Sequence, residues 1–209
     1  MTRLFLIRHG QTAWNKKKRY QGQTNISLTQ EGRKQAQAIA NAFKETRIDL
    51  LFSSSLKRAR QTALIISKKM GTKPVWDPRL QELSFGAWEG QTAKELSGKK
   101  DPAFLKWSQG RFVTPPGGES LASLRKRIRA FIKDFVEPAK DKHIAVVSHA
   151  GPIKVMIFEL LGFPLRSLWS VQIDPASISV LSFHKHFVQL NYLNRVISAA
   201  HPAGEVFRK

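Results

Sequence analysis

Short apolar runs alternate along this chain with segments in which apolar residues recur every three or four positions. Each run ends at small or polar residues, as a buried strand that leads into a loop does. The runs are residues 4–7, 49–53, 75–76 and 144–147, followed later by 178–183 and 187–192. The segments with helical spacing are residues 29–44, 56–70, 120–136 and 152–161. Strands that alternate with helices predict an α/β fold with a largely parallel sheet.

Residue types at the ends of the segments agree with these helices. Thr29 is of a type that caps helix N-termini. Pro152 falls in the first turn of the last helix, and Gly162 stands just behind its end. Over about residues 84–120 the pattern weakens, and Gly, Pro, Trp and Lys become frequent. We predict one domain over residues 1–209, in which this stretch is an insertion with short helices that forms a lid.

The composition is that of a folded domain. A length of 209 residues suits one domain, and a hydrophobic content of 42% with 13 Phe and 5 Trp supplies a core. The absence of Cys excludes disulfide scaffolds, thiolate nucleophiles and Cys-based metal sites. Because no apolar stretch matches a secretory signal or a bilayer span, we expect a cytoplasmic protein with no membrane partner.

The chain is strongly basic. It carries 35 Lys and Arg against 15 Asp and Glu, which gives a formal net charge of +20. Because the basic residues are spread along the chain, a solvated basic surface is the favoured interpretation. A protein that handles anions is the alternative, since such a charge attracts polyanions at low salt.

Two histidines stand behind two of the predicted strands. His9 follows the run 4–7, and His149 follows the run 144–147. In open α/β sheets, ligands bind at the carboxyl ends of the strands, so we expect both imidazoles at the same edge. A histidine in such a place can be a core residue, a metal ligand or a catalyst.

A helix start and an acidic loop supply further candidates. Arg58 lies in the first turn of a predicted helix, which is a natural site for a phosphate. Arg58 and Arg60 project to different sides, so at most one of them points at the site. Glu82 and Glu89 stand among apolar and aromatic residues, which suits an acid/base catalyst. The pattern alone does not distinguish these two acids.

Taken together, these motifs resemble those of the histidine phosphatase superfamily, also called the phosphoglycerate-mutase-like family. The matching blocks, in family order, are the Arg-His-Gly motif at 8–10, then 20–22 with 28–29, 53–63, 80–90, 115–120 and 146–151. The resemblance covers about residues 3–195, and so many blocks in order are specific. It implies a three-layer α/β/α sandwich with a mostly parallel central sheet and a small lid-like insertion.

The resemblance also implies roles for the matching residues. His9 would be the nucleophile that becomes phosphohistidine, and Glu82 would be the proton donor and acceptor. Arg8 and Arg58 would clamp the phosphoryl oxygens, to which His149 would donate. The implied substrate-binding residues are Asn15, Thr12, Gln21, Gly22, Ala150 and Gly151.

Elementary chemistry agrees with these roles. A phosphate monoester carries about −1.5 to −2 charge at pH 7, and guanidinium forks bind its oxygens in a way that Lys cannot reproduce. A neutral imidazole can attack without a strong base, provided that its other nitrogen is held, which we expect from a backbone carbonyl. No metal or cofactor is expected. His184 and His186 share one face of a predicted strand but have no third ligand nearby.

Within the family, the phosphatase branch is more similar to this chain than the mutase branch. Residues 85–90 and 116–120 look like those of α-ribazole phosphatases, metal-independent phosphoserine phosphatases and broad-specificity phosphatases. We therefore expect a phosphoric monoester hydrolase for a small phosphorylated metabolite, as a monomer or a homodimer. Phosphoryl transfer of the phosphoglycerate-mutase type is one alternative. A polyanion or nucleic-acid binder on this scaffold is the other, although no nucleic-acid motif is present.

The chain departs from the family pattern in three places. Asn25 stands where Asp is usual, and Ala150 replaces the commoner Gly. Residues 199–209 have no clear counterpart in the family. None of these departures touches the implied catalytic set.

Aromatic residues are frequent near the predicted insertion and the last predicted helix. Those that could line a substrate cavity are Trp14, Phe85, Trp88, Phe104 and Trp107. Those that could form a dimer face are Phe158, Phe163 and Trp169. For most of the cavity-lining candidates, core packing is the favoured interpretation, because aromatic side chains are mostly buried. For the dimer-face candidates, core packing is the alternative.

Overall fold

The computed structural model describes residues 1–197, and within them six strands form one sheet in the order β3-β2-β4-β1-β5-β6. The strands are β1 (Thr2–Arg8), β2 (Leu50–Ser53), β3 (Pro74–Trp76), β4 (His143–Ser148), β5 (Ser177–Phe183) and β6 (Val188–Val196). Strands β1 to β4 are parallel, whereas β5 is antiparallel to β1 and β6 is antiparallel to β5. The sheet is therefore mostly parallel, which confirms the prediction.

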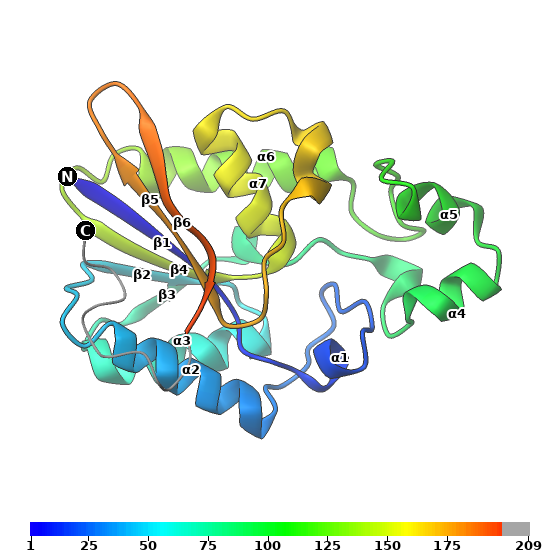
Figure 1. Ribbon diagram of the computed structural model, residues 1–209, viewed down its shortest axis with the longest axis horizontal. Helices are drawn as coiled ribbons and strands as arrows, with labels where there is room; N and C mark the ends of the chain where they lie inside the picture. The colour runs from blue at the N-terminus through cyan, green and yellow to red at the C-terminus, as the bar shows by residue number, and fades with distance from the viewer. Residues whose placement is uncertain (198–209) are drawn as a thin grey trace.

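Helices cover both faces of this sheet (Figure 1). On one face lie α2 (Gln30–Ala42) and α3 (Lys57–Met70), and on the other lie α6 (Leu121–Phe131) and α7 (Ala150–Leu161). The shorter elements are α1 (Ala13–Lys16), η1 (Pro78–Leu80), η2 (Gly86–Trp88), α4 (Ala93–Gly98), α5 (Pro102–Ser108), η3 (Ile132–Val136) and η4 (Leu165–Ser170). The molecule is the three-layer α/β/α sandwich that the resemblance implies.

Strand β1 shows why its sequence reads as a continuous apolar run. Leu4 and Leu6 pack into the core on the side of α6 and α7, whereas Phe5 and Ile7 pack into the core on the side of α2 and α3. Successive side chains of a strand point to opposite faces, and helices cover both faces here. Both sets of side chains are therefore buried, and this strand does not alternate between apolar and polar residues.

The predicted insertion lies beside the sheet rather than over it. Helices α4 and α5 stand beyond the carboxyl ends of the strands (Figure 1). Trp88, Phe104 and Trp107 of this segment are buried and belong to the same core as α6 and α7. Core packing, the favoured interpretation, is confirmed for Trp88 and Phe104, whereas Trp107 packs into the core and also lines a cavity. These side chains anchor the insertion.

Three local details differ from the predictions. The helix expected to reach residue 136 changes to π-helical geometry over Ile132–Val136, and this change leaves both end residues of that turn buried. Helix α7 begins at Ala150, before Pro152, because proline is tolerated in a first turn. His184 and His186 lie in the turn between β5 and β6, not on a strand. The tail at 199–209 lies outside the described residues.

Candidate active site

Two neighbouring strand ends bring the two histidines together. In the parallel pair β1 and β4, Arg8 lies opposite Ser148, so His9 and His149 are the next residues on the two strands. Their ring centroids are 5.0 Å apart. The prediction that both imidazoles share one edge of the sheet is confirmed.

His9 is held in a single tautomer. Its Nδ1 lies 2.8 Å from the carbonyl oxygen of Gly10, and because a carbonyl only accepts, Nδ1 carries the hydrogen. Burial lowers the pKa of His9 well below its usual value, and the charges of Arg58 and Arg8 lower it further. The imidazole is therefore neutral at pH 7, and its lone pair lies on Nε2, which accepts from Arg58 Nε at 3.2 Å. The expected backbone carbonyl is the one that Gly10 provides.

His149 is buried beside His9 with the opposite nitrogen facing Arg58. Its Nε2 lies 2.8 Å from Ser54 Oγ, and its Nδ1 accepts a hydrogen bond from Arg58 Nε at 3.2 Å. Burial, followed by the charge of Arg58, lowers the pKa of His149 well below its usual value. In this arrangement Nδ1 is an acceptor. Donation to a phosphoryl oxygen would require that this nitrogen gain a proton when the anion binds.

Arg58 joins the two histidines. It lies in the first turn of α3 and is fully buried. Its Nε donates to His9 Nε2 and to His149 Nδ1, at 3.2 Å in each case. Its Nη2 and Nη1 donate to the carbonyls of Gly22 and Thr24, at 2.6 and 2.9 Å. Backbone carbonyls thus fix the guanidinium without neutralising it.

The guanidinium groups of the site are not neutralised by a carboxylate in direct contact within the described residues. Within residues 1–197, neither Arg8 nor Arg58 forms an ion pair, and Arg8 Nε has no hydrogen-bond partner. Arg8 Nη1 donates to the carbonyl of Ile173 at 2.6 Å. Desolvation lowers the pKa of both guanidinium groups, that of Arg58 to about 10. Because unpaired buried charge is costly, the site is complementary to an anion.

The structure shows which member of each candidate pair belongs to the site, namely which of the two arginines and which of the two glutamates. Arg60 is exposed and lies over the Trp76 ring, 4.9 Å from its centroid, so only Arg58 points at the site. The Glu89 carboxylate accepts from the backbone N–H groups of Gln23 and Thr24, at 3.0 and 2.9 Å. Glu89 thus holds a loop, whereas Glu82 lines the cavity.

The Glu82 carboxylate contacts the N-terminus of α7 from a loop. Its Oε1 accepts from the backbone N–H of Leu83 at 2.9 Å and from that of Gly151 at 3.1 Å. The cavity that Glu82 lines is also bounded by Arg8, His9 and Arg58. A Cβ on Gly151 would overlap Glu82 Oε1, so glycine is needed for this approach.

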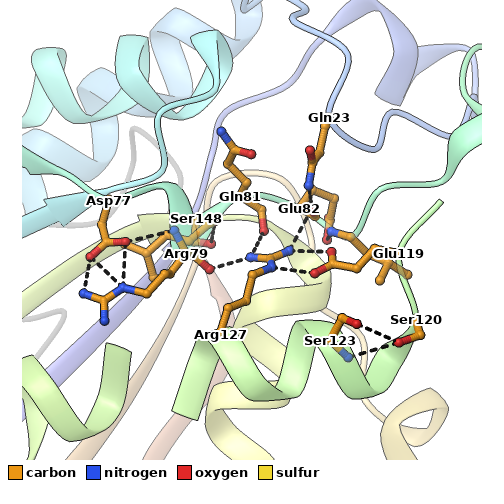
Figure 2. Close-up of polar contacts among 12 residues, drawn as sticks. Gln23, Asp77, Arg79, Gln81, Glu82, Glu119, Ser120, Ser123, Arg127 and Ser148 are labelled. Atoms are coloured by element: carbon orange, nitrogen blue, oxygen red, sulfur yellow. Dashed lines mark hydrogen bonds and ion pairs between the residues drawn. The ribbon is translucent and has the colours of Figure 1, made fainter. Parts of the chain in front are cut away.

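Arg127 holds the loop that carries Glu82 (Figure 2). Its Nη1 donates to the carbonyls of Arg79 and Gln81, and its Nη2 donates to the carbonyl of Glu82 at 3.0 Å. Nε and Nη2 both bind the Glu119 carboxylate at 2.8 Å. The interpretation of the basic residues as solvated surface is wrong for Arg127, whose side chain is only 18% exposed. No motif marks it, because its partners are mainly backbone atoms.

Most of the predicted substrate-binding residues meet at one cavity of about 220 Å³. Those that line it are Asn15, Gln21, Gly22, Ala150 and Gly151. Thr12 is buried at the start of α1 instead, where its Oγ1 lies 2.9 Å from Gln21 Oε1. The structure thus gives Thr12 a supporting contact behind the cavity wall rather than a place in it.

The outer wall of the cavity contains residues that sequence reasoning did not assign to the site. It includes Arg19, Tyr20, Phe112, Leu124, Lys154 and Trp169. Phe85 and Trp107, which the sequence offers as cavity-lining candidates, stand in the same wall. They come from the first loop, the insertion, α6, α7 and η4. No local pattern links these segments, so only the tertiary fold reveals the wall.

Within the described part of the chain, no group of three His, Asp or Glu residues is placed to hold a metal ion. His184 stacks on Phe187, and its Nε2 lies 3.2 Å from Gln189 Oε1. These contacts account for His184 as a turn residue. Independence of metal ions stays a prediction.

Comparison with known proteins decides the family. The model of the histidine phosphatase superfamily (branch 1) matches residues 4–196. The chain belongs to the histidine phosphatase superfamily. The matched range includes every candidate catalytic residue described above.

Named phosphatases of this superfamily are similar to the chain over nearly its whole length. Phosphoserine phosphatase 1 of Hydrogenobacter thermophilus is 35% identical over 87% of this chain and 86% of its own. The adenosylcobalamin/α-ribazole phosphatase of Escherichia coli is 30% identical over 92% of this chain and 95% of its own. A solved mycobacterial glucosyl-3-phosphoglycerate phosphatase is 32% identical, with a TM-score of 0.84 over 92% of this chain and 99% of that one.

One departure from the superfamily pattern has a structural explanation. Asn25 Oδ1 accepts from the backbone N–H of Lys57 at 3.0 Å, at the start of α3. An amide oxygen thus satisfies a helix N-terminus next to Arg58, as a carboxylate would. Ala150 lies at the first position of α7 and lines the cavity, where the helix backbone tolerates its methyl group.

Proposed function

We propose that this histidine phosphatase hydrolyses a phosphomonoester of a small metabolite through a phosphohistidine formed on His9. One observation carries the proposal. A neutral imidazole, fixed in one tautomer by Gly10, presents Nε2 beside two guanidinium groups that form no ion pair within residues 1–197. This is what an attack on a phosphate dianion requires: a nucleophile without negative charge, and cations that offset the charge of the substrate.

In the first step, His9 Nε2 attacks phosphorus and the bond from phosphorus to the ester oxygen breaks. Arg8 and Arg58 bind the equatorial oxygens, over which charge is spread in the transition state. Glu82, in its acid form, gives a proton to the leaving oxygen. The dianion favours a proton on His149 Nδ1, which then becomes a donor to the same oxygens.

In the second step, the Glu82 carboxylate takes a proton from water. The resulting hydroxide attacks phosphorus, the bond from phosphorus to nitrogen breaks, and inorganic phosphate leaves. His9 returns to its neutral tautomer because Gly10 still accepts from Nδ1. The backbone N–H groups of Leu83 and Gly151 keep the carboxylate oriented in both steps.

The substrate is the one partner that this chemistry requires. Assembly as a monomer or a homodimer and a cytoplasmic location remain predictions from the sequence. Among residues 1–197, no helix is long and apolar enough to span a bilayer.

The test is phosphate release from an aryl phosphate in the presence of EDTA, for wild type and for His9→Ala. We expect turnover in wild type and a loss of at least about 10³-fold in the variant, because the nucleophile is removed. Turnover that EDTA abolishes would overturn metal independence, and turnover that survives in His9→Ala would overturn the phosphohistidine. Transfer to a monophosphate acceptor faster than release to water would favour a mutase.

A further inference from the structure

The mouth of the cavity is built from a continuous row of aromatic rings. Phe85 packs edge-on against Trp107 at 5.7 Å, and Trp107 packs edge-on against Trp169 at 4.7 Å. Phe112 stacks parallel to Trp169 at 5.9 Å. The last two rings are 37% and 42% exposed, although they line a cavity. Exposed apolar surface at a cavity mouth indicates a ligand that covers it.

The charges along this wall are one-sided. Among the described residues that line the cavity, Glu82 is the only acid, and the proposed mechanism uses it. Two cations lie outside the phosphate clamp, namely Arg19 and Lys154. Arg19 is paired with the Glu95 carboxylate at 3.0 Å. A substrate ammonium group would therefore meet no carboxylate except the one that must move protons.

Lys154 is the cation of this wall without a partner. It lies one turn into α7, it is half-buried, and it forms neither an ion pair nor a hydrogen bond within residues 1–197. Its Nζ stands over the ring of Trp169, 5.7 Å from the centroid. Burial lowers the pKa of Lys154, and the charge of Glu82 opposes this shift only in part. An anion beside the ammonium group would offset the remaining cost.

We infer that the alcohol part of the substrate is an aromatic or similarly flat apolar group that carries a second anionic group, bound by Lys154. The flat group covers Trp169 and Phe112, and the phosphate occupies the clamp of Arg8 and Arg58. Zwitterionic substrates such as phosphoserine are disfavoured, because they lack the flat apolar group and because Glu82 is the only described cavity-lining carboxylate that their ammonium group would meet. This inference rests on the proposed phosphatase function and adds the chemical class of its substrate.

The test uses aryl phosphates that share one ring and have similar leaving groups. They are 4-(carboxymethyl)phenyl, 4-methylphenyl and 4-(aminomethyl)phenyl phosphate, with phosphoserine as the zwitterionic comparison. We expect kcat/KM to fall in the order carboxymethyl, methyl, aminomethyl, by about tenfold from first to last, which corresponds to about 1.4 kcal/mol. Phosphoserine is expected to be poorer than the methyl compound.

Variants assign the preference to named side chains. Lys154→Met is expected to lower kcat/KM for the carboxymethyl substrate to that of the methyl one, whose own value changes little, whereas Lys154→Arg retains the preference. Lys126→Met is the matched control, because it removes the same charge from an exposed position outside the cavity. Trp169→Ala is expected to raise KM severalfold for all three aryl phosphates and to leave the KM of phosphoserine less affected.

The outcomes separate this inference from the proposed function. Hydrolysis of no phosphomonoester would contradict the proposed function itself. Hydrolysis of aryl phosphates with no effect of the carboxylate, or an equal loss in Lys126→Met and Lys154→Met, would overturn the role of Lys154. A preference for phosphoserine would overturn the substrate class while the phosphatase function stands.

Discussion

The floor and the mouth of the cavity are built on different principles. His9 and Arg58 lie on the floor, and His149 contacts both of them from outside the cavity lining. All three side chains are buried and fixed by hydrogen bonds, several of them to backbone atoms. At the mouth, Phe112 and Trp169 are more than one-third exposed and are held by ring contacts between distant segments. Each side chain on the floor is therefore held in one conformation, whereas residues at the mouth can be substituted without loss of the catalytic arrangement.

This contrast assigns the chemistry to the floor and the choice of substrate to the mouth. A group that performs covalent chemistry must be held to a fraction of an ångström, and hydrogen bonds to backbone atoms achieve that. Apolar contacts at a rim tolerate substitution at a modest cost. Changes to the floor should therefore slow every substrate equally, whereas changes to the mouth should alter the ranking of substrates.

The largest effect that tests this contrast is expected for Glu82→Gln. The amide cannot supply or accept the proton, so kcat should fall by about 10²–10⁴-fold for every phosphomonoester. The ranking of substrates should stay as in wild type, since the mouth is intact. Steady-state kinetics on a panel of aryl phosphates measures both quantities.

The Glu82→Gln side chain still offers an oxygen that accepts from the backbone N–H of Gly151, so we expect this variant to fold like wild type. A loss confined to substrates with poor leaving groups would show that Glu82 acts only in the first step. A changed ranking of substrates would contradict the division between floor and mouth.

The next largest effect is expected for Arg127→Met. Removal of the guanidinium releases the carbonyls of Gln81 and Glu82 and the Glu119 carboxylate, so the Glu82 carboxyl loses its fixed position. We expect kcat to fall by about 10- to 100-fold with little change in KM, because small displacements of a catalytic group are costly. A thermal melt of the variant reports how much stability is lost at the same time.

Two further variants separate positioning from simple loss of charge. Arg125→Met, on the same helix, removes an exposed guanidinium paired with Glu159 and should leave kcat close to that of wild type. Arg127→Lys should not restore kcat, because an ammonium cannot reproduce the fork that reaches two segments. Full activity in Arg127→Lys would contradict a positioning role.

A smaller effect is expected on stability at acid pH. The pKa of both buried imidazoles lies below 6.5 in the folded chain. As pH falls below about 6.5, the unfolded chain binds protons that the folded chain does not, so the free energy of unfolding decreases. Each imidazole contributes up to about 1.4 kcal/mol per pH unit. This contribution is fully present above pH 6.5.

Urea denaturation at pH 7.5 and 5.5 tests this linkage. Wild type should lose more stability over this interval than the double variant His9→Asn, His149→Gln, which has no imidazole at either position, and the difference is at most about 3 kcal/mol. An equal pH dependence of the two proteins would mean that the imidazoles are not held neutral in the folded state.

The residues of the floor could be predicted from the sequence to a greater extent than those of the mouth. His9 and His149 could be placed together because each follows a strand, and parallel strands end at one edge of a sheet. Helical spacing shows that at most one of Arg58 and Arg60 can point at the site. Glu82 and Arg127 could not be singled out from position alone, since they are held by loop backbone atoms that follow no period.

Most of the mouth could not be predicted, for a different reason. Of its aromatic row, the sequence offers only Phe85 and Trp107 as cavity-lining candidates. Trp169 had been considered for a dimer face or the core, and Lys154 had no assignment. Their contacts join the insertion to α7 and η4, segments that only the tertiary fold brings together. The strands and helices and the largely parallel sheet follow from hydrophobic pattern, and the three layers follow from the family resemblance, but a wall assembled from several segments follows from neither.

The central claim is that the phosphoryl group passes through His9. The direct measurement is an alkaline quench of enzyme mixed with an aryl phosphate, followed by peptide mapping by mass spectrometry. We predict a phosphoryl group on His9 within the first turnover, more abundant in Glu82→Gln and absent in His9→Ala. A phosphoryl group on another residue, or none in a protein that turns over substrate, would contradict the account.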